Sequence, residues 1–217
     1  MDNTQYIKYK NKYVNLKNKI NRAGIILIEK SYNNQKGRDE PAIILFRGQS
    51  MCADGGGRMD KEDANLKVTA TRELMEESAN LFRLSTNILK DNLSYTYKDR
   101  ICYFVGIIGP ININYFKDNI KTISQFKISE SWKEVTRIHR FYISDLKNMD
   151  LNVPDHLISV TDADGNSDLI IMERTKIAIK NGLFKVLNQI QYEQLHENLN
   201  FQEGSNKFLY GTKCYQI

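Results

Sequence analysis

Three glutamates at helical spacing are the residues of this chain best suited to chemistry. Glu73, Glu76 and Glu77 occupy positions i, i+3 and i+4, which share one face of a helix with about 3.6 residues per turn. Like charges placed in this way repel one another and weaken an isolated helix. A bound hard cation such as Mg²⁺ or Mn²⁺, which prefers oxygen ligands, would relieve that repulsion. The alternative interpretation is an acidic face covered by solvent.

The residues in front of the glutamates favour the metal-binding interpretation. A triple glycine, Gly55–Gly57, precedes the predicted helix, and Arg72 stands directly before Glu73. Glycine permits close approach of the backbone and dihedral angles that bulky residues do not adopt. An ordinary strand-to-helix turn does not need three glycines in a row. Their position before an acidic helix therefore indicates a binding site.

This segment resembles the Nudix box of the Nudix hydrolases, G-x5-E-x7-R-E-U-x-E-E-x-G-U, in which U is an aliphatic residue. The R-E-U-x-E-E half matches at Arg72–Glu77. The first half is stretched, because the early acid is Glu62 when counted from Gly56 and Asp63 when counted from Gly57. Its gap to the R-E-U-x-E-E half exceeds the pattern by two residues or by one. These departures concern the loop before the helix and leave the metal-binding face intact.

The resemblance implies hydrolysis of a phosphoanhydride (pyrophosphate) bond. Divalent metals assist such a reaction by neutralising phosphate oxygens and making a bound water more acidic. The implied ligands of Mg²⁺, or of Mn²⁺ as a substitute, are Glu73, Glu76 and Glu77 with a backbone carbonyl of Gly56 or Gly57. The implied catalytic residues are Glu77, Glu76, Arg72 and Glu62. Within this set, Arg72 is expected to pair with the early acid, Glu62 or Asp63, and to brace the loop against the helix. Glu77 is the first choice for the group that activates the water, and Glu134 is the second.

The charge of the chain points to a polyanionic substrate. The net charge is +5 despite the acidic helix, so positive charge must gather elsewhere and would attract an anion. Arg22 opens an apolar strand in Asn-Arg-Ala-Gly-Ile-Ile-Leu-Ile, which, with the triple glycine, resembles the diphosphoinositol polyphosphate phosphohydrolase subgroup. That resemblance implies diphosphoinositol polyphosphates and/or dinucleoside polyphosphates as substrates. The candidate substrate-binding residues are Lys19, Arg22, Arg47, Arg58, Arg100, Arg137 and Arg140.

Two other functions fit the sequence. Removal of the mRNA 5′ cap would need a basic track for RNA and an aromatic residue that stacks on the cap base. Candidates for stacking are Trp132, Tyr95, Tyr97 and Tyr103, and candidates for the track are Arg174, Lys176, Lys180 and Lys185. The second alternative is a binding module on a catalytically worn Nudix fold. Ala79 and Asn80, which stand where the box has glycine and an aliphatic residue, motivate it together with the stretched first half.

Composition predicts a single cytoplasmic domain. The chain has 217 residues, of which 41% are hydrophobic and 26% charged, as is typical of globular proteins. No apolar run is long enough to span a bilayer, and the N-terminus lacks the apolar segment of a signal peptide. The three scattered cysteines are read as reduced thiols without a disulfide framework or a zinc site. No membrane contact and no obligatory protein partner are inferred.

The alternation of strands and helices predicts an α/β fold, a Nudix-type α/β/α sandwich with a central mixed β-sheet and added terminal helices. Strands are expected at Ala23–Glu29, Ala42–Phe46, Asn92–Tyr97, Ile101–Ile108 and Ile138–Ile143. Helices are expected at about Ala64–Phe82, near Asp145, and from about Asp168 to Leu195 with Ser167 or Asp168 as N-cap. The expected organisation is a basic helix in 1–21, a Nudix core in 22–150 and a helical extension in 151–217. The Lys/Tyr-rich opening is similar in composition to leaders found on proteins of large DNA viruses.

Overall fold

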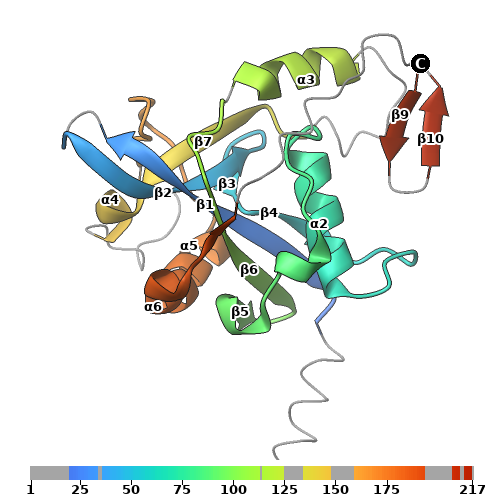
Figure 1. Cartoon of the computed structure of the whole chain (residues 1–217), viewed down its shortest axis with the longest axis horizontal. Coiled ribbons are helices and arrows are strands. Elements are labelled where there is room, and N and C mark those ends of the chain that lie inside the picture. Colours follow the sequence, from blue (N-terminus) through green and yellow to red (C-terminus); the bar gives the residue numbers. More distant parts are fainter. Residues whose placement is uncertain are drawn as a thin grey trace, which may run out of the picture.

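The computed structural model describes residues 20–33, 36–112, 114–124, 134–147, 159–193, 207–210 and 213–216. The basic helix expected in residues 1–21 lies outside these ranges up to residue 19. Figure 1 shows a twisted sheet with helices on both of its faces. None of the helices in the described ranges is long and apolar enough to cross a membrane.

In the described part of the chain, eight strands form one central sheet. Its strands are β1 (Arg22–Asn33), β2 (Arg38–Arg47), β3 (Cys52–Ala53), β4 (Gly55–Arg58), β5 (Ser94–Tyr97), β6 (Arg100–Ile107), β7 (Arg137–Tyr142) and β8 (Tyr192–Glu193). The main order is β3-β2-β1-β6-β5, while β4 pairs with β1, β7 with β2 and β8 with β6. The β1–β6 and β6–β8 pairs are parallel and the others antiparallel, so the expected mixed sheet is confirmed. Two further strands, β9 (Lys207–Tyr210) and β10 (Lys213–Gln216), form a separate hairpin.

Two hydrophobic cores lie on opposite faces of the sheet. Along β1 the side chains alternate between them, as the pleat of a strand requires: Ile25 and Leu27 join one core, and Ile26 and Ile28 join the other. The first core is covered by α2 (Leu66–Glu77) and α3 (Asn114–Ser124). The second is covered by α4 (Ile143–Lys147), α5 (Glu173–Ala178), the π-helical turn η5 (Ile179–Leu183) and α6 (Phe184–Val186). This is the expected α/β/α sandwich.

The acidic helix α2 begins and ends for local reasons. Its N-cap is Asn65, whose side chain accepts hydrogen bonds from the backbone N–H groups of Lys67 and Val68, as is usual for this residue type. It ends at Glu77 because Ala79 and Asn80 adopt positive φ angles of 50° and 66°, which an α-helix does not accommodate. The observed helix is therefore shorter at both ends than the predicted one.

The C-terminal helix differs more from the prediction. Helix α5 begins at Glu173, with Met172 as N-cap, so the expected start at Asp168 and the expected N-cap are wrong. Leu169 and Ile171 are instead extended, form β-bridges to Val160 and Cys52, and bury their side chains. Helical turns then run through α5, η5, α6 and the 3₁₀ turn η6 (Leu187–Gln189), and β8 follows.

Two further 3₁₀ turns, η1 (Thr86–Ile88) and η2 (Asp91–Leu93), precede β5. The division between a core in 22–150 and an extension stays a prediction.

Candidate active site

Helix α2 packs against β1 and β4, which brings its glutamates to the triple glycine. The glycines make this close packing possible. A Cβ atom on Gly55 would lie 2.8 Å from Cδ1 of Leu74, and a Cβ atom on Gly57 would lie 2.3 Å from Oε2 of Glu73. The backbone N–H of Gly56 donates a hydrogen bond to Oε2 of Glu77 at 3.2 Å. Glu73 and Glu77 therefore both contact β4.

Both of these carboxyl groups hold protons more tightly than usual. Burial raises the pKa of Glu73 to about 7; the positive charge of Arg72 opposes the shift and Glu76 adds to it. Burial also raises the pKa of Glu77 well above its ordinary value, and the negative charges of Asp54 and Glu73 act in the same direction. Such shifts report an excess of negative charge at a poorly solvated position. Glu73 and Glu77 therefore lie where a cation would be stabilised.

Arg72 braces the loop between β4 and α2. Its Nε and Nη2 atoms donate to the two carboxylate oxygens of Asp63 at 3.1 and 2.9 Å, and Nη2 also donates to the carbonyl of Arg58 at 2.9 Å. Asp63 is buried, and its second oxygen also accepts the backbone N–H of Asp60 at 3.0 Å. Glu62 is exposed. The structure thus selects Asp63 over Glu62 as the partner of Arg72, because only Asp63 turns inward beneath the loop.

Glu76 takes a different position from its two neighbours. It is buried, and the Nη1 atom of Arg72 donates to its Oε1 at 3.2 Å. The same nitrogen lies 3.0 Å from Glu73. Within the described ranges, no group of three or more His, Cys, Asp or Glu side chains is arranged to hold a metal ion. The donors that fit a hard divalent ion are the Glu73 and Glu77 carboxylates and the adjoining glycine backbone, while Glu76 is held by Arg72.

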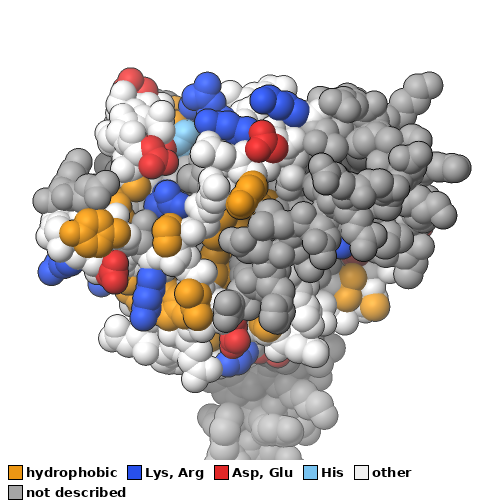
Figure 2. Space-filling model, turned by 45° about the horizontal axis from the view of Figure 1, so that its top comes forward, with side chains coloured by type: hydrophobic (Ala, Val, Ile, Leu, Met, Phe, Trp, Pro, Cys, Tyr) orange, Lys and Arg blue, Asp and Glu red, His pale blue; other side chains and the backbone are white. Residues whose placement is uncertain are grey.

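The expected substrate-binding arginines separate into two groups. In the first, the side chains reach the surface. Arg22 and Arg58 are direct partners in the β1–β4 register, and Arg47 and Arg137 are direct partners in the β2–β7 register. Arg22 lies 3.6 Å from the exposed Asp99. Figure 2 shows several Lys and Arg side chains near the upper edge of the face that it presents, with Asp and Glu side chains beside them. Lys19 lies outside the described residues.

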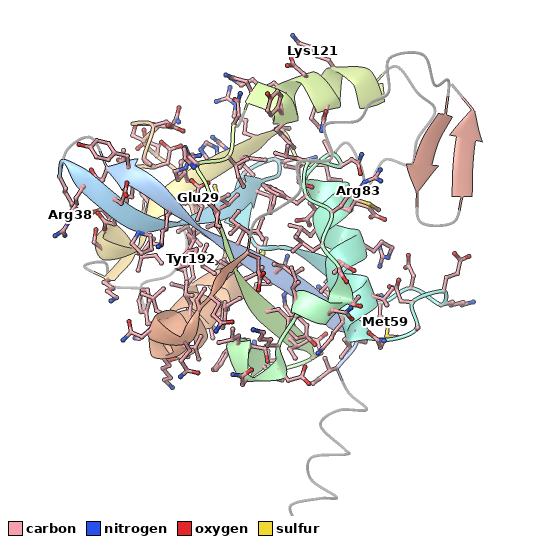
Figure 3. All side chains as sticks on the ribbon, viewed as in Figure 1. Glu29, Arg38, Met59, Arg83, Lys121 and Tyr192 are labelled. Carbon is pink, nitrogen blue, oxygen red and sulfur yellow. The ribbon has the colours of Figure 1, made fainter. Side chains whose placement is uncertain are left out.

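The second group, Arg100 and Arg140, is buried in ion pairs. Arg100 pairs with Asp54, and Arg140 pairs with Glu29 and donates to the carbonyl of Ile111 at 3.0 Å. Figure 3 places Glu29 on β1 well away from Met59, which begins the loop that leads from β4 to α2. The charges of these two arginines are neutralised inside the protein. We therefore propose no substrate contact for either of them.

Other expected residues have ordinary positions. Glu134, the second choice for the base, is exposed on the segment before β7. Tyr103 is buried in the core beside α2, and Tyr95 and Tyr97 are half-buried on β5. Trp132 lies outside the described residues. The two free cysteines described, Cys52 and Cys102, are buried.

Asp54 is the residue near the site that sequence reasoning missed. Its carboxylate is 1% exposed, pairs with Arg100, and accepts the hydroxyl of Thr175 on α5 at 2.9 Å. Nε of Arg174 lies 4.0 Å away. Burial alone would raise the pKa of Asp54, but Arg100 and Arg174 hold it below the ordinary value. Its position directly before Gly55 is the only signal in the sequence that could have drawn attention to it.

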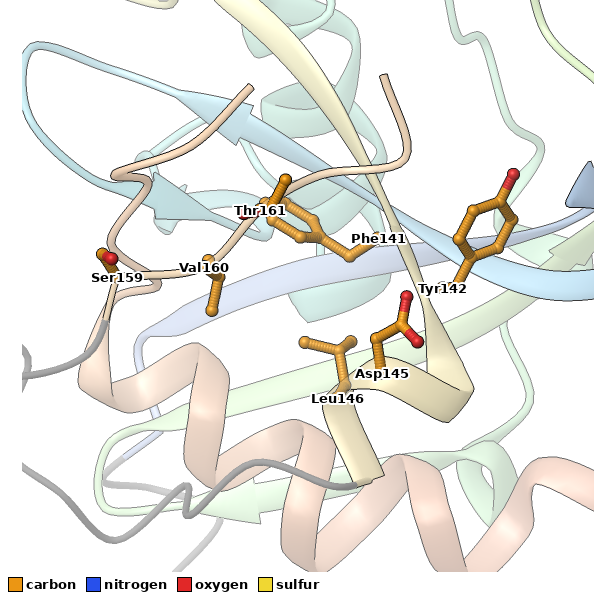
Figure 4. A pocket seen from close by; sticks show the side chains of 7 residues that line it. All are labelled: Phe141, Tyr142, Asp145, Leu146, Ser159, Val160 and Thr161. Carbon is orange, nitrogen blue, oxygen red and sulfur yellow. The ribbon is translucent and has the colours of Figure 1, made fainter. Parts of the chain in front are cut away.

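A pocket of about 280 Å³ lies on the opposite side of the sheet from α2, between β7, α4 and residues 159–161. Figure 4 shows the lining side chains Phe141, Tyr142, Asp145, Leu146, Ser159, Val160 and Thr161. Asp145 is the one carboxylate among them, and it pairs with Lys36 at 3.1 Å. The pocket therefore does not belong to the glutamate site.

Comparison with known proteins gives similarity of fold. No protein-family model and no curated protein matches the chain. A crystal structure of a Caenorhabditis elegans Ap4A hydrolase binary complex matches with a TM-score of 0.36 and 13% identity, over 58% of this chain and 82% of that one. MutT/nudix family proteins from Enterococcus faecalis and Listeria innocua match with TM-scores of 0.44 and 0.40 and identities of 13% and 14%. The first covers 87% of this chain and 70% of its own, and the second 77% and 93%. Similarities at these levels say nothing about activity.

Proposed function

We propose that this protein is a Mg²⁺-dependent Nudix hydrolase that cleaves a phosphoanhydride bond in a polyanionic substrate. The observation that carries the proposal is the packing of Glu73 and Glu77 against the triple glycine. Two carboxyl groups of raised pKa lie there, where α2 packs against β4. The ion pair between Arg72 and Asp63 fastens the loop between this strand and this helix to the helix. Maintaining this arrangement costs stability in the absence of a cation. A catalytic metal site explains why the chain retains it.

The residues present fit a hard divalent ion. Glu73 and Glu77, with a backbone carbonyl of Gly56 or Gly57, would hold Mg²⁺ or Mn²⁺, and Glu76 would join them on release from Arg72. When bound, the ion supplies neutralisation of phosphate oxygens and acidification of a water. Glu77 accepts a proton from the attacking water. Arg72 holds the loop against α2 so that the strand and the helix keep their relative position.

The arginines beside the triple glycine, at the paired ends of β1 and β4, support a polyanionic substrate. Arg22 and Arg58 lie directly opposite each other beside Gly57, and like charges in this arrangement destabilise a sheet. Arg174 on α5 is subject to the same repulsion: burial and the positive charges of Arg100 and Arg22 lower its pKa, while the negative charges of Asp54 and Glu77 oppose that shift. An anionic group bound beside these arginines would relieve the repulsion between their positive charges. Our first choice of substrate is therefore a diphosphoinositol polyphosphate or a dinucleoside polyphosphate.

A panel of hydrolysis assays, in which the two products of each substrate are separated by ion-exchange chromatography, tests the proposal. Wild-type protein with Mg²⁺ is compared with Glu77→Gln on a diphosphoinositol polyphosphate, a dinucleoside polyphosphate, ADP-ribose and capped RNA. We expect turnover of at least one polyphosphate, a loss of roughly a hundredfold or more in the variant, and no turnover in EDTA. Turnover of capped RNA alone would instead identify a decapping enzyme.

One observation favours the second candidate, a binding module. In the structure Arg72 contacts both Glu73 and Glu76, so part of the acidic face is already neutralised by the protein itself. A binding module would hold a polyphosphate without cleaving it. Isothermal titration of the same compounds distinguishes the two functions. Binding that is equally tight in wild type and Glu77→Gln, without turnover in either, would establish the module and exclude the hydrolase.

A further inference from the structure

The guanidinium of Arg100 occupies a gap in the sheet that two glycines create. Gly24 on β1 and Gly56 on β4 are direct partners in the antiparallel register. A Cβ atom would lie 2.2 Å from Nη2 of Arg100 if it were added to Gly24, and 2.5 Å from the same nitrogen if it were added to Gly56. Any residue other than glycine at either position would therefore displace the arginine. The pair of glycines brings a buried positive charge directly against the backbone of β4.

Arg100 and Glu77 form hydrogen bonds with the two polar groups of the Gly56 backbone, the carbonyl and the N–H. Nη1 of Arg100 donates to the carbonyl of Gly56 at 3.5 Å, and the N–H of Gly56 donates to Glu77 at 3.2 Å. A hydrogen bond of 3.5 Å is long, so the fit of the guanidinium into the glycine gap contributes more to the constraint than this bond does. A shift of Arg100 would move the strand that positions the Glu77 carboxylate.

A buried network on the other side of the sheet fixes Arg100 in turn. Asp54 pairs with Nη2 of Arg100, accepts the Thr175 hydroxyl at 2.9 Å, and donates its own N–H to the same hydroxyl oxygen at 3.3 Å. Asp54 and Thr175 are at most 1% exposed, and Arg100 is 6% exposed. Buried groups bonded in this way have little freedom to move, because breaking one contact leaves a charged partner unsatisfied.

We propose that Arg100 is a positioning residue for the glutamate site, held in place by Asp54 and by Thr175 of α5. The proposal rests on the proposed function. It gives the C-terminal part of the chain, which the Nudix resemblance does not cover, a role in the reaction. The path from Thr175 through Asp54, Arg100 and Gly56 ends at Glu77 without contact to substrate. Its loss affects the geometry of the site rather than the binding of the substrate.

Thr175→Val tests the proposal with the least disturbance, because valine keeps the shape of threonine and removes the hydroxyl. Thr175→Ser keeps the hydroxyl, and Thr96→Val changes an exposed threonine of β5 as the matched control. Positioning residues around metal ligands affect metal affinity or activity by about 10–100-fold. We expect Thr175→Val to lower kcat roughly tenfold and to raise the half-saturating Mg²⁺ concentration, with the substrate KM within about twofold. Thr175→Ser should restore both values. Arg100→Lys should resemble Thr175→Val if it folds.

Two results separate this proposal from the proposed function. A Thr175→Val protein that melts at a lower temperature, yet keeps wild-type kcat and Mg²⁺ dependence below its melting range, would overturn the positioning role and leave the hydrolase intact. If the wild type cleaves no substrate, Mn²⁺ binding followed by electron paramagnetic resonance replaces turnover as the readout. Weaker Mn²⁺ binding by Thr175→Val than by wild type and Thr96→Val supports the role even then. Equal binding in all three proteins, or no binding by the wild type, overturns it.

Discussion

Arg72 and Asp63 form a bidentate ion pair that joins the last part of the loop before α2 to the middle of the helix. Both donor distances, 3.1 and 2.9 Å, are those of good charge-assisted hydrogen bonds. Only 14% of the Arg72 side chain and 4% of the Asp63 side chain are exposed. Burial would raise the pKa of Asp63, but the hydrogen bond from Arg72 and that from the Asp60 backbone hold it below the ordinary value. The pair therefore stays charged and rigid at neutral pH.

Replacing Asp63 by asparagine should lower the free energy of unfolding by about 1–3 kcal/mol, because Arg72 loses a charged partner in a poorly solvated place. Glu62→Gln, one residue away and exposed, should change it by less than about 0.5 kcal/mol. Urea denaturation of the three proteins at pH 7 measures both values. If Glu62→Gln were the more destabilising change, Glu62 would be the true partner of Arg72 in solution.

Two neighbouring glycines should respond differently to alanine. At Gly56 the new Cβ would lie 2.3 Å from Cα of Gly24 and 2.4 Å from the carbonyl oxygen of Ala23, which are backbone atoms that cannot move away. At Gly57 the atoms nearest to it would be those of the Glu73 carboxylate, which can rotate. We expect Gly56→Ala to lose roughly 2–4 kcal/mol of stability. Gly57→Ala should lose less than about 1 kcal/mol but weaken Mg²⁺ activation by displacing Glu73.

Thermal unfolding and Mg²⁺ titration of activity check the two parts of this prediction separately. Gly165→Ala is a useful control, since nothing lies within 4 Å of its added Cβ although its φ angle is +83°. It should cost only the backbone strain of a residue at positive φ, roughly 1 kcal/mol. Equal melting temperatures for Gly56→Ala and Gly57→Ala would contradict the register in which Gly56 faces Gly24.

The acidic helix could be predicted from the sequence because its signal is local. The spacing of Glu73, Glu76 and Glu77 defines a helix face without reference to the rest of the chain. The central strands were found for a similar reason: Ala42–Phe46 is an apolar run buried on both faces of the sheet, as expected of a central strand. The choice between Glu62 and Asp63 could not be made in this way, because it depends on which residue of a turn points inward.

The network behind the site could not be predicted, because its members are distant in the chain. Asp54 meets Arg100 across 46 residues and Thr175 across 121, and no spacing rule links such positions. The start of the C-terminal helix was missed for a different reason. Asp168 has the side chain of an N-cap, but Leu169 and Ile171 alternate on a buried, extended segment, and tertiary burial outweighed the local signal.

Glu40 should give the protein a measurable acid sensitivity unrelated to the candidate site. It is 5% exposed and accepts hydrogen bonds from Asn33 at 3.0 Å, from the Ser144 backbone at 3.2 Å and from Lys36 at 3.2 Å. Burial would raise its pKa, but these bonds bring it below the ordinary value of 4.5. An acid whose pKa is lowered by folding stabilises the protein above its unfolded pKa, and that stabilisation is lost as the pH falls through the folded value.

The test compares wild type with Glu40→Gln in urea at pH 7 and at about pH 3. At pH 7 the variant should be less stable by roughly 1–3 kcal/mol, and the difference should shrink at the lower pH. Glu193→Gln, at an exposed position on β8, controls for the general effect of removing a negative charge. A difference that stays the same at both pH values would show that the contacts of Glu40 do not depend on its ionisation.

Ala79 stands where the Nudix pattern has glycine, and its backbone has a conformation that favours glycine. Its φ angle of 50° lies in the left-handed region, where a Cβ atom costs about 1–2 kcal/mol. The methyl group is fully buried in the core beside α2, and its burial stabilises the protein by about 0.8 kcal/mol. Ala79→Gly should therefore stabilise the protein slightly, by up to about 1 kcal/mol. Ala79→Val should destabilise it by roughly 2–4 kcal/mol, because a β-branched residue fits neither the angle nor the space.

Urea midpoints of the two variants, with Asn80→Gly as the control, measure this effect. Asn80 also has a positive φ angle, 66°, but asparagine tolerates that conformation better than alanine does, so its replacement by glycine should change stability less. If Ala79→Val were as stable as wild type, the helix would have to end differently in solution, without a left-handed residue at position 79. A gain in stability for Ala79→Gly, with the Mg²⁺-dependent turnover of the proposed function unchanged, would show that alanine at this position affects folding and leaves the glutamate face unchanged.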